Sequence, residues 1–258
     1  MSPAPLLVFD FDGVLCDGMP EYWWAARRAA LALEPGLDLP EQAPPAFAQL
    51  RPLIHKGWEM VLIAAELARP GFDPVAALAD YPGSLREALE RCGHGPVVLQ
   101  ETLERVRRDA IAEDAEAWLA LHRFYPGVIE RLHGLDAEGA AWSVLTTKGG
   151  AFAARLLAAV GLQPQAVNGH EQGTKPEVLL RLFRRERPLW FIEDRRPTLQ
   201  LVRRTAGLEA VRCFLALWGY LGPGDASGLD PLGIAPLALE RFRAPLAQWI
   251  ESARVRPY

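Results

Sequence analysis

Apolar residues form a short uninterrupted run near the start of the chain. Leu6-Leu7-Val8-Phe9 follows two prolines and precedes an acidic loop that contains Gly13. A run of this length with no polar position is typical of a strand that is buried on both faces, as in the centre of a parallel sheet. The pattern therefore predicts a central strand over residues 6–9.

Residues 21–122 have apolar positions at helical spacing, and no convincing strand pattern interrupts them. The clearest stripe is formed by Trp58, Val61, Leu62, Ala65 and Ala68. Ser84-Leu-Arg-Glu87 fits a capping box and Gly93 fits a C-terminal stop, which together predict a helix over residues 85–92. A long helix is predicted after it, from about residue 99 to 121.

Strand-like and helix-like patterns alternate after residue 125. The predicted strands cover residues 141–145, 166–168, 189–192 and 210–214, and the predicted helices cover 151–160, 176–185 and 197–206. This alternation is typical of βαβ units, whose right-handed crossovers make the sheet parallel. Residues 219–233 are predicted to form a loop, and residues 236–252 one closing helix.

These elements predict an α/β fold with a doubly wound, Rossmann-like parallel-sheet core and an α-helical cap inserted after the first strand. The expected core comprises residues 1–18 and 124–258, and the expected cap comprises residues 19–123. Ligands of such sheets bind at the carboxyl ends of the strands, so an insertion directly after the first strand is placed to act as a lid.

Composition and charge exclude several classes of protein. Half of the 258 residues are apolar, which excludes a disordered chain, and 28 basic against 32 acidic residues argue against nucleic acid as a partner. No apolar stretch approaches the roughly 20 residues of a membrane span, so no membrane partner is expected. The first residues do not resemble a secretory signal, and three widely spaced cysteines suit no disulfide framework. We expect a cytoplasmic protein; the sequence leaves its oligomeric state open.

Asp10 and Asp12 directly follow the predicted central strand, and Gly13 lets the chain turn sharply beside them. Two neighbouring carboxylates at the edge of a core are unfavourable unless a cation is bound or one of them holds a proton. Oxygen ligands with open coordination positions suit Mg²⁺. Taken alone, the motif favours an acidic turn that caps a helix.

Three further polar motifs recur at or near later strand ends. They are Thr146-Thr147-Lys148-Gly149-Gly150, Gly173-Thr174-Lys175-Pro176 and Glu193-Asp194. Each has an ordinary interpretation by itself, as a helix N-cap, a solvated lysine and an acidic cap. Together they gather acids for a cation with hydroxyls, an ammonium group and a helix N-terminus for an anion, which indicates a phosphate-ester site.

The order of these motifs resembles the haloacid dehalogenase-like hydrolases. Within that superfamily, four motifs are similar to the phosphoglycolate phosphatases and their capped relatives: Tyr-Pro-Gly-Val at 125–128, Leu-Thr-Thr-Lys at 145–148, Lys-Pro at 175–176 and Trp-Gly-Tyr at 218–220. The similarity covers residues 5–18 and about 124–220.

The resemblance implies that Asp10 is a nucleophile that becomes an aspartyl phosphate and that Asp12 is the general acid and base. It implies that Thr146, with Thr147 beside it, and Lys175 bind the phosphoryl oxygens. Dehalogenases and phosphonoacetaldehyde hydrolases lack the acid at the position of Asp12, so its presence here favours phosphate-ester hydrolysis. The implied activity is that of a phosphoric monoester hydrolase acting on a small phosphorylated metabolite.

The resemblance further implies a Mg²⁺ site. Its ligands would be Asp10, the main-chain carbonyl of Asp12, Asp194 and Glu193. The family usually has another acid four or five residues after Asp194, but Thr198 and Leu199 stand there. A degenerate member with a binding or regulatory role therefore stays open as an alternative. A sugar-phosphate mutase of the same superfamily is a separate alternative.

The basic turn before the Trp58 helix is a candidate for substrate recognition. Arg51 and Lys56 in this turn could meet an anionic part of the substrate. The alternative is an ordinary solvated helix start.

Overall fold

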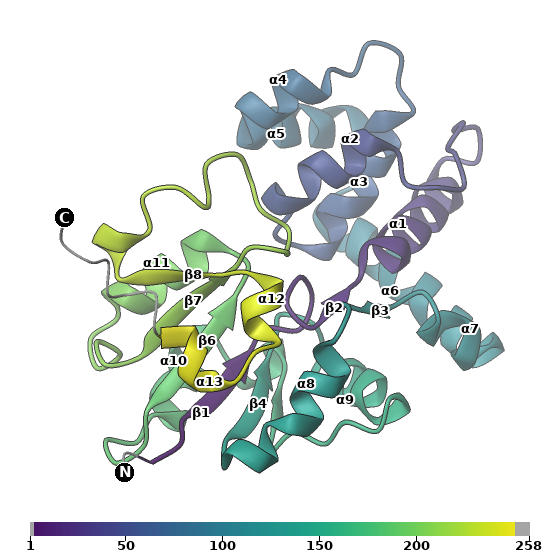
Figure 1. Cartoon of the computed structure of the whole chain (residues 1–258). Coiled ribbons are helices and arrows are strands. Elements are labelled where there is room, and N and C mark those ends of the chain that lie inside the picture. The colour runs from purple at the N-terminus through teal and green to yellow at the C-terminus, as the bar shows by residue number, and fades with distance from the viewer. Residues whose placement is uncertain (1–2, 251–258) are drawn as a thin grey trace. The chain divides into compact units, whose positions relative to one another are not determined.

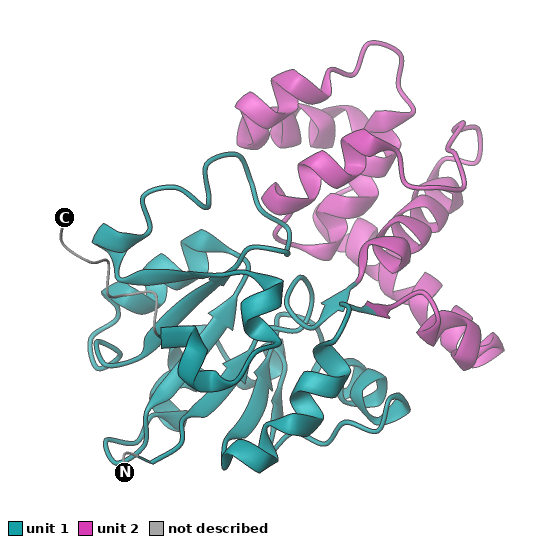
Figure 2. Ribbon diagram, in the orientation of Figure 1, with its two compact units in different colours: residues 1–17, 124–258 teal, residues 18–123 magenta. Residues whose placement is uncertain are grey.

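The computed structural model describes residues 3–250, which form two compact units (Figures 1 and 2). The first unit comprises the chain up to Asp17 and from Phe124 onward, and the second comprises Gly18–Arg123. A small sheet of β2 (Cys16–Asp17) and β3 (Arg123–Phe124) lies where the chain passes between the units.

The first unit is built on a six-stranded sheet in the order β5-β4-β1-β6-β7-β8. Its strands are β1 (Leu6–Phe9), β4 (Ala141–Leu145), β5 (Val167–Asn168), β6 (Leu189–Glu193), β7 (Arg212–Ala216) and β8 (Ile234–Leu237). Every pairing is parallel, and the first strand in sequence lies in the middle of the sheet. This topology confirms the predicted doubly wound α/β fold.

Successive residues of a strand point to opposite sides of the sheet, so an all-apolar strand such as β1 gives both faces apolar side chains. Helices cover both faces. Leu6 and Val8 join a buried cluster with residues of α10 (Lys175–Leu182) and α11 (Arg196–Arg204). On the opposite face, the Phe9 ring lies 5.9 Å from that of Phe242 in α12. The remaining helices of this unit are α8 (Val128–Gly134), α9 (Gly150–Ala159), α12 (Leu239–Phe242) and α13 (Leu246–Ile250). Figure 1 shows α8, α12 and α13 on one side of the sheet.

The second unit is helical, as the apolar spacing predicts. Its α-helices are α1 (Met19–Leu33), α2 (Pro45–Leu50), α3 (Gly57–Leu67), α4 (Pro74–Ala79), α5 (Tyr81–Cys92), α6 (Pro96–Glu113) and α7 (Ala115–Leu119). A buried ion pair joins α1 to α6: Arg107 donates two hydrogen bonds of 2.7 Å to the carboxylate of Glu21. Within residues 3–250, no helix is both long and apolar enough to cross a bilayer.

Two helix predictions in this unit are wrong in detail. Helix α5 begins at Tyr81 rather than residue 85, because the Asp80 carboxylate accepts the Gly83 N–H at 3.0 Å and caps the helix four residues before Ser84. The predicted helix over residues 99–121 is divided between α6 and α7. Asp114 separates them and caps α7 by accepting the N–H groups of the second and third residues that follow it.

The predicted closing helix over residues 236–252 is also wrong. Residues 234–237 instead form the edge strand β8, followed by the short helices α12 and α13, while residues 251–252 lie outside the described part of the chain. Pro236 is tolerated in an edge strand because one side of that strand needs no donor. Pro245 then lacks the N–H that a continuous helix would need.

Candidate active site

The parallel register brings the chemically active residues to one edge of the sheet. Phe9 in β1 pairs with Val144 on one side and with Ile192 on the other. The residues that follow these strands therefore emerge next to one another at the carboxyl ends. Asp10, Thr146 and Asp194 lie there and are all buried.

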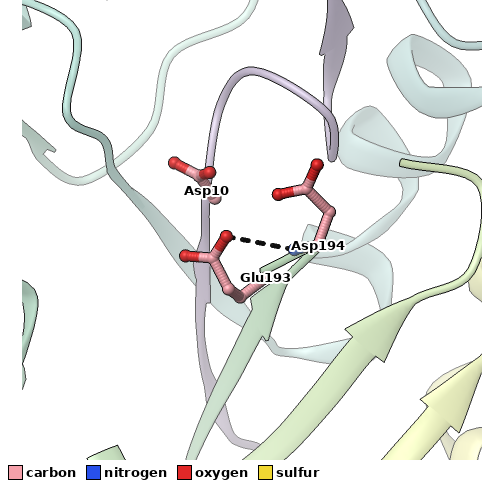
Figure 3. A group of neighbouring side chains, drawn as sticks. All are labelled: Asp10, Glu193 and Asp194. Carbon is pink, nitrogen blue, oxygen red and sulfur yellow. Dashed lines mark hydrogen bonds between the residues drawn. The ribbon is translucent and has the colours of Figure 1, made fainter. Parts of the chain in front are cut away.

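Three of these residues form a compact acidic cluster. Asp10, Glu193 and Asp194 each place one carboxylate oxygen within 4.8 Å of the others (Figure 3). Burial raises the pKa of Asp10 to about 7, and the charge of Glu193 adds to that rise although Lys175 opposes it. Burial also raises the pKa of Glu193. Burial and neighbouring negative charge thus both favour the neutral form of Asp10.

Lys175 supplies the one cation that touches this cluster in an ion pair among the described contacts. Its Nζ lies 2.9 Å from Oδ1 of Asp10 and 2.6 Å from Oε2 of Glu193. Burial alone would lower the pKa of Lys175. The charges of Asp10 and Glu193 outweigh that effect and raise the pKa above its ordinary value, so the ammonium keeps its charge. A capping box between Thr174 and Glu177 starts α10 at Lys175 and fixes the lysine's backbone.

Glu193 has a structural task in addition to its charge. Its Oε2 accepts the Lys175 hydrogen bond, while Oε1 accepts the main-chain N–H groups of Asp194 and Arg195 at 3.1 and 3.0 Å. The carboxylate thus orients Lys175 and holds the turn after β6. If Glu193 also binds a metal ion, as predicted, the ion has to contact oxygens that already accept these hydrogen bonds.

Asp194 lies in a cradle that the sequence reasoning missed. A Cβ atom on Gly13, whose φ is +89°, would come within 2.0 Å of Oδ2 of Asp194, and one on Gly219 within 2.3 Å of its Cβ. The main-chain N–H of Tyr220 donates to the same Oδ2 at 2.8 Å. The Trp-Gly-Tyr motif after β7 could have pointed to this cradle, because a glycine at a strand end often marks a close approach of backbone.

Lys148 is a second lysine that the sequence reasoning did not include in the site. Its Nζ lies 3.4 Å from Oδ1 of Asp12, and the two side chains are only 12% and 11% exposed. The main-chain N–H of Lys148 donates to Oγ1 of Thr146 at 3.0 Å, which fixes the loop after β4. The sequence feature that could have pointed to Lys148 is its position in the loop after a predicted strand, next to two threonines.

The loop after β4 differs from its predicted form. Thr146 is buried beside the other strand ends, whereas Thr147 is exposed. At the helix N-terminus that was expected to help hold an anion, the first amide already has a partner. The N–H of Gly150 donates to Oε1 of Glu171 at 2.9 Å, so a carboxylate of the chain already occupies that amide.

No protein-family model and no curated protein matches this chain. Several solved structures match it at high probability. A predicted phosphoglycolate phosphatase from Haemophilus somnus is 18% identical, with a TM-score of 0.59 over 88% of this chain and 92% of that chain. A haloacid dehalogenase-like family hydrolase from Streptococcus pneumoniae is 15% identical, with a TM-score of 0.54 over 92% of this chain and 94% of that chain.

A predicted phosphatase from Clostridium acetobutylicum is 14% identical, with a TM-score of 0.54 over 92% of this chain and 94% of that chain. The chain has the haloacid dehalogenase-like fold. Because the identities are this low, the likeness concerns the fold, and an activity has to be argued from the residues of the site.

The residues at this edge of the sheet fit a divalent cation. Oxygen ligands are what Mg²⁺ prefers, and three buried carboxylates here each place an oxygen within 4.8 Å of the others. The position of the usual further acid is filled differently: Thr198 is half-buried in the first turn of α11, and Leu199 is fully buried in the core. Neither residue can add a carboxylate.

The predicted substrate contacts Arg51 and Lys56 lie in the second unit. The Arg51 guanidinium is half-buried and lies 4.5 Å from the centre of the Tyr22 ring. Lys56 is exposed immediately before α3. Their contact with a substrate stays a prediction.

Proposed function

We propose that the protein is a Mg²⁺-dependent phosphatase that hydrolyses a phosphate monoester of a small metabolite in the cytoplasm. The observation that carries the proposal is the arrangement at the sheet edge, where Lys175 bridges Asp10 and Glu193 beside the buried Asp194. A phosphoryl group needs cations around its oxygens and a nucleophile in line with the leaving oxygen. This edge offers a carboxylate nucleophile and a fixed ammonium group within 2.9 Å of it.

In the first step, an oxygen of Asp10 forms a bond to phosphorus while the bond to the ester oxygen breaks. Asp12 donates its proton to the departing oxygen, which leaves as an alcohol. In the second step, Asp12 takes a proton from water as the water oxygen attacks phosphorus. The bond to Asp10 breaks, and inorganic phosphate and the free carboxylate result.

Lys175 and Thr146 are the proposed ligands of the phosphoryl oxygens. A phosphoryl group that reaches Asp10 comes close to the Lys175 ammonium, which stabilises negative charge on the oxygens. Thr146 follows the adjacent strand and is buried at the same edge. Thr147 belongs to the same loop, and its exposure favours a main-chain rather than a side-chain contact.

Asp10, Asp194, Glu193 and the main-chain carbonyl of Asp12 would hold Mg²⁺. When bound, the ion would neutralise the crowded carboxylates and the phosphoryl oxygens. Asp194 is the most constrained of these residues, because Gly13, Gly219 and the Tyr220 N–H surround it. We expect this cradle to compensate for the missing acid at Thr198.

The second unit is the proposed cap. It is inserted after Asp17, at the end of the short strand β2 that follows the loop holding Asp10 and Asp12. A helical lid of this kind would exclude water during phosphoryl transfer. Arg51 and Lys56 would then meet an anionic part of the substrate.

Hydrolysis of 4-nitrophenyl phosphate by purified protein tests this function. We expect turnover with Mg²⁺, none with EDTA, and none in Asp10→Asn, while Asp136→Asn at an exposed position of the same unit keeps native turnover. Absence of metal-dependent turnover across a broad panel of phosphate esters would instead favour a binding or regulatory role. Isomer interconversion that requires a bisphosphate activator would indicate a mutase.

A further inference from the structure

We propose that Tyr220 is a positioning residue that ties the proposed metal ligand Asp194 to Asp17, so that a cation held by Asp194 also steadies strand β2. The inference rests on the proposed function, because Asp194 is a proposed Mg²⁺ ligand. It goes further by naming a route from the metal site to the point where the chain leaves the first unit, directly after Asp17. All three residues belong to the first unit.

Tyr220 donates hydrogen bonds to two carboxylates that lie far apart in the sequence. Its main-chain N–H donates to Oδ2 of Asp194 at 2.8 Å, and its hydroxyl donates to Oδ1 of Asp17 at 2.7 Å. A tyrosine side chain has only two rotatable bonds, so the two donor groups are joined by a stiff connector. A shift of one carboxylate therefore disturbs the hydrogen bond to the other.

The two residues that precede this tyrosine contact the segment that ends in β2. Nε1 of Trp218 donates to the main-chain carbonyl of Val14 at 2.9 Å. A Cβ atom on Gly219 would lie 2.4 Å from the main-chain oxygen of Gly13, so the two backbones are in close contact there. Together with the tyrosine, these residues hold the segment 13–17 against the chain that follows β7.

Backbone hydrogen bonds of this segment report whether it is ordered. The N–H groups of Leu15 and Cys16 both donate to the carbonyl of Phe11 at 2.9 Å. The N–H of Tyr125, which follows β3, donates to the carbonyl of Leu15 at 3.1 Å. Hydrogen exchange of these amides therefore measures how often the segment opens.

Tyr125 also shows that the two carboxylates act on a common surrounding. Burial raises the pKa of the Tyr125 hydroxyl, and the charges of Asp17 and Asp194 both add to the rise, while a hydrogen bond with Tyr220 opposes it. The phenol therefore keeps its proton and adds no charge to the group. This agrees with a single tyrosine that bridges the two carboxylates.

Coupling between two sites is reciprocal. If Tyr220 joins the metal site to β2, Mg²⁺ must favour the ordered form of β2, and that form must bind Mg²⁺ more tightly by the same factor. A hydroxyl that only stabilised the fold would slow the opening of β2 equally with and without Mg²⁺. The dependence on Mg²⁺ therefore separates a positioning role from a structural one.

The test measures hydrogen exchange of residues 13–17 and Mg²⁺ affinity by calorimetry, in the native protein and in Tyr220→Phe. The substitution keeps the ring and the N–H that contacts Asp194, and it removes only the hydrogen bond to Asp17. We expect saturating Mg²⁺ to slow exchange by about fivefold or more in the native protein and by less than about twofold in the variant. The variant should bind Mg²⁺ about three- to fivefold more weakly.

Three further variants control this comparison. Tyr81→Phe removes a hydroxyl that donates to the buried Glu59 at 3.0 Å in the second unit, and it should keep both native values. Asp17→Ala removes the Tyr220 hydrogen bond from the other side and should reproduce Tyr220→Phe, which provides a second test if that variant fails to fold. Asp17→Asn keeps an acceptor oxygen and should retain part of the Mg²⁺ effect. Thermal unfolding shows which variants are folded.

Two results would overturn the inference. A Mg²⁺ effect of native size in Tyr220→Phe would mean that the ion acts on the segment without the tyrosine, for example through the carbonyl of Asp12. Exchange that is faster by the same factor with and without Mg²⁺, at unchanged Mg²⁺ affinity, would reduce the hydroxyl to a structural role.

Metal-free protein separates this inference from the proposed function. If the native protein binds no Mg²⁺, the proposed function is wrong, and Asp194→Ala then decides the inference because it removes the acceptor of the Tyr220 N–H. It should speed exchange of residues 13–17 by about fivefold or more alone, and by less than about twofold when combined with Tyr220→Phe. Equal acceleration in the two backgrounds, or none in either, would contradict the inference.

Discussion

The two units bury acidic side chains in different ways. In the second unit, Glu21 is fully buried and matched by the two hydrogen bonds from Arg107, and the buried Glu66 pairs with Arg69 and Arg91. In the first unit, three buried carboxylates lie together, and Lys175 pairs with two of them, Asp10 and Glu193. The balanced pairs hold helices together, whereas in the proposed function the unbalanced cluster receives a further cation and an incoming phosphoryl group. The ratio of charges, rather than burial alone, distinguishes the two.

Asp10→Asn gives the largest expected effect on the unbalanced cluster. We expect kcat to fall by about 10⁴-fold or more, because no other residue would accept the phosphoryl group. The unfolding temperature should stay the same or rise, since the substitution removes a repelling charge. A steady-state assay with thermal unfolding of the same preparation checks both, and a large loss of stability would contradict the contrast between the units.

Arg107→Met probes a balanced pair in the second unit. Removing the arginine leaves the Glu21 charge buried without its partner, which should lower the free energy of unfolding by about 3–5 kcal/mol. Denaturant unfolding measures the change. Replacing Glu21 with Leu in the same variant should recover most of the loss, and no recovery would mean that the pair does more than balance charge.

Gly219→Ala sharpens the account of the Asp194 cradle. The added methyl group would lie 2.3 Å from Cβ of Asp194, so the backbone must shift at a cost of about 1–3 kcal/mol. We expect weaker Mg²⁺ binding in calorimetry. Gly36→Ala, where nothing lies within 4 Å, is the matched control, and equal Mg²⁺ affinity in the two variants would count against the cradle.

A smaller effect is expected from pH. The pKa of Asp10 is raised to about 7 in the folded protein, against about 4 in an unfolded chain. The folded state therefore holds a proton that the unfolded state has lost between these values, and the stability of the metal-free protein should fall as pH rises from 4 to 7. Mg²⁺ competes with that proton, so the rise in unfolding temperature that it causes should grow from pH 5.5 to 8. A rise that is constant with pH would place the ion elsewhere.

The sequence was sufficient for the elements that depend on local pattern. The apolar run 6–9 and the alternation after residue 125 predict the parallel sheet, and the ends of its adjacent strands bring Asp10 and Asp194 to one edge. Lys175 reaches the same edge from the start of α10, several residues after β5. The edge strand β8 was missed because a four-residue run with a proline has too weak a strand pattern. Its position depends on pairing with β7, which is a tertiary contact.

The residues that complete the site depend on contacts between distant segments. Gly219 and Tyr220 reach Asp194 only because the chain returns to the sheet edge after β7, and Lys148 meets Asp12 across two strand ends. No spacing within one segment encodes such contacts. The cap of α5 was missed for a different reason, because it is a local contact: the Asp80 carboxylate accepts the Gly83 N–H, and the helix starts before Ser84.

Mass spectrometry of an acid-quenched reaction tests the central claim most directly. The protein would be mixed with Mg²⁺ and a phosphate ester, stopped within the first turnovers, and digested. We predict that the peptide containing Asp10 gains the mass of one phosphoryl group, that fragmentation places the group on Asp10, and that Asp10→Asn gains none. Turnover by the native protein with no phosphoryl group on the peptide that contains Asp10 would contradict the account, and so would a phosphoryl group on another residue.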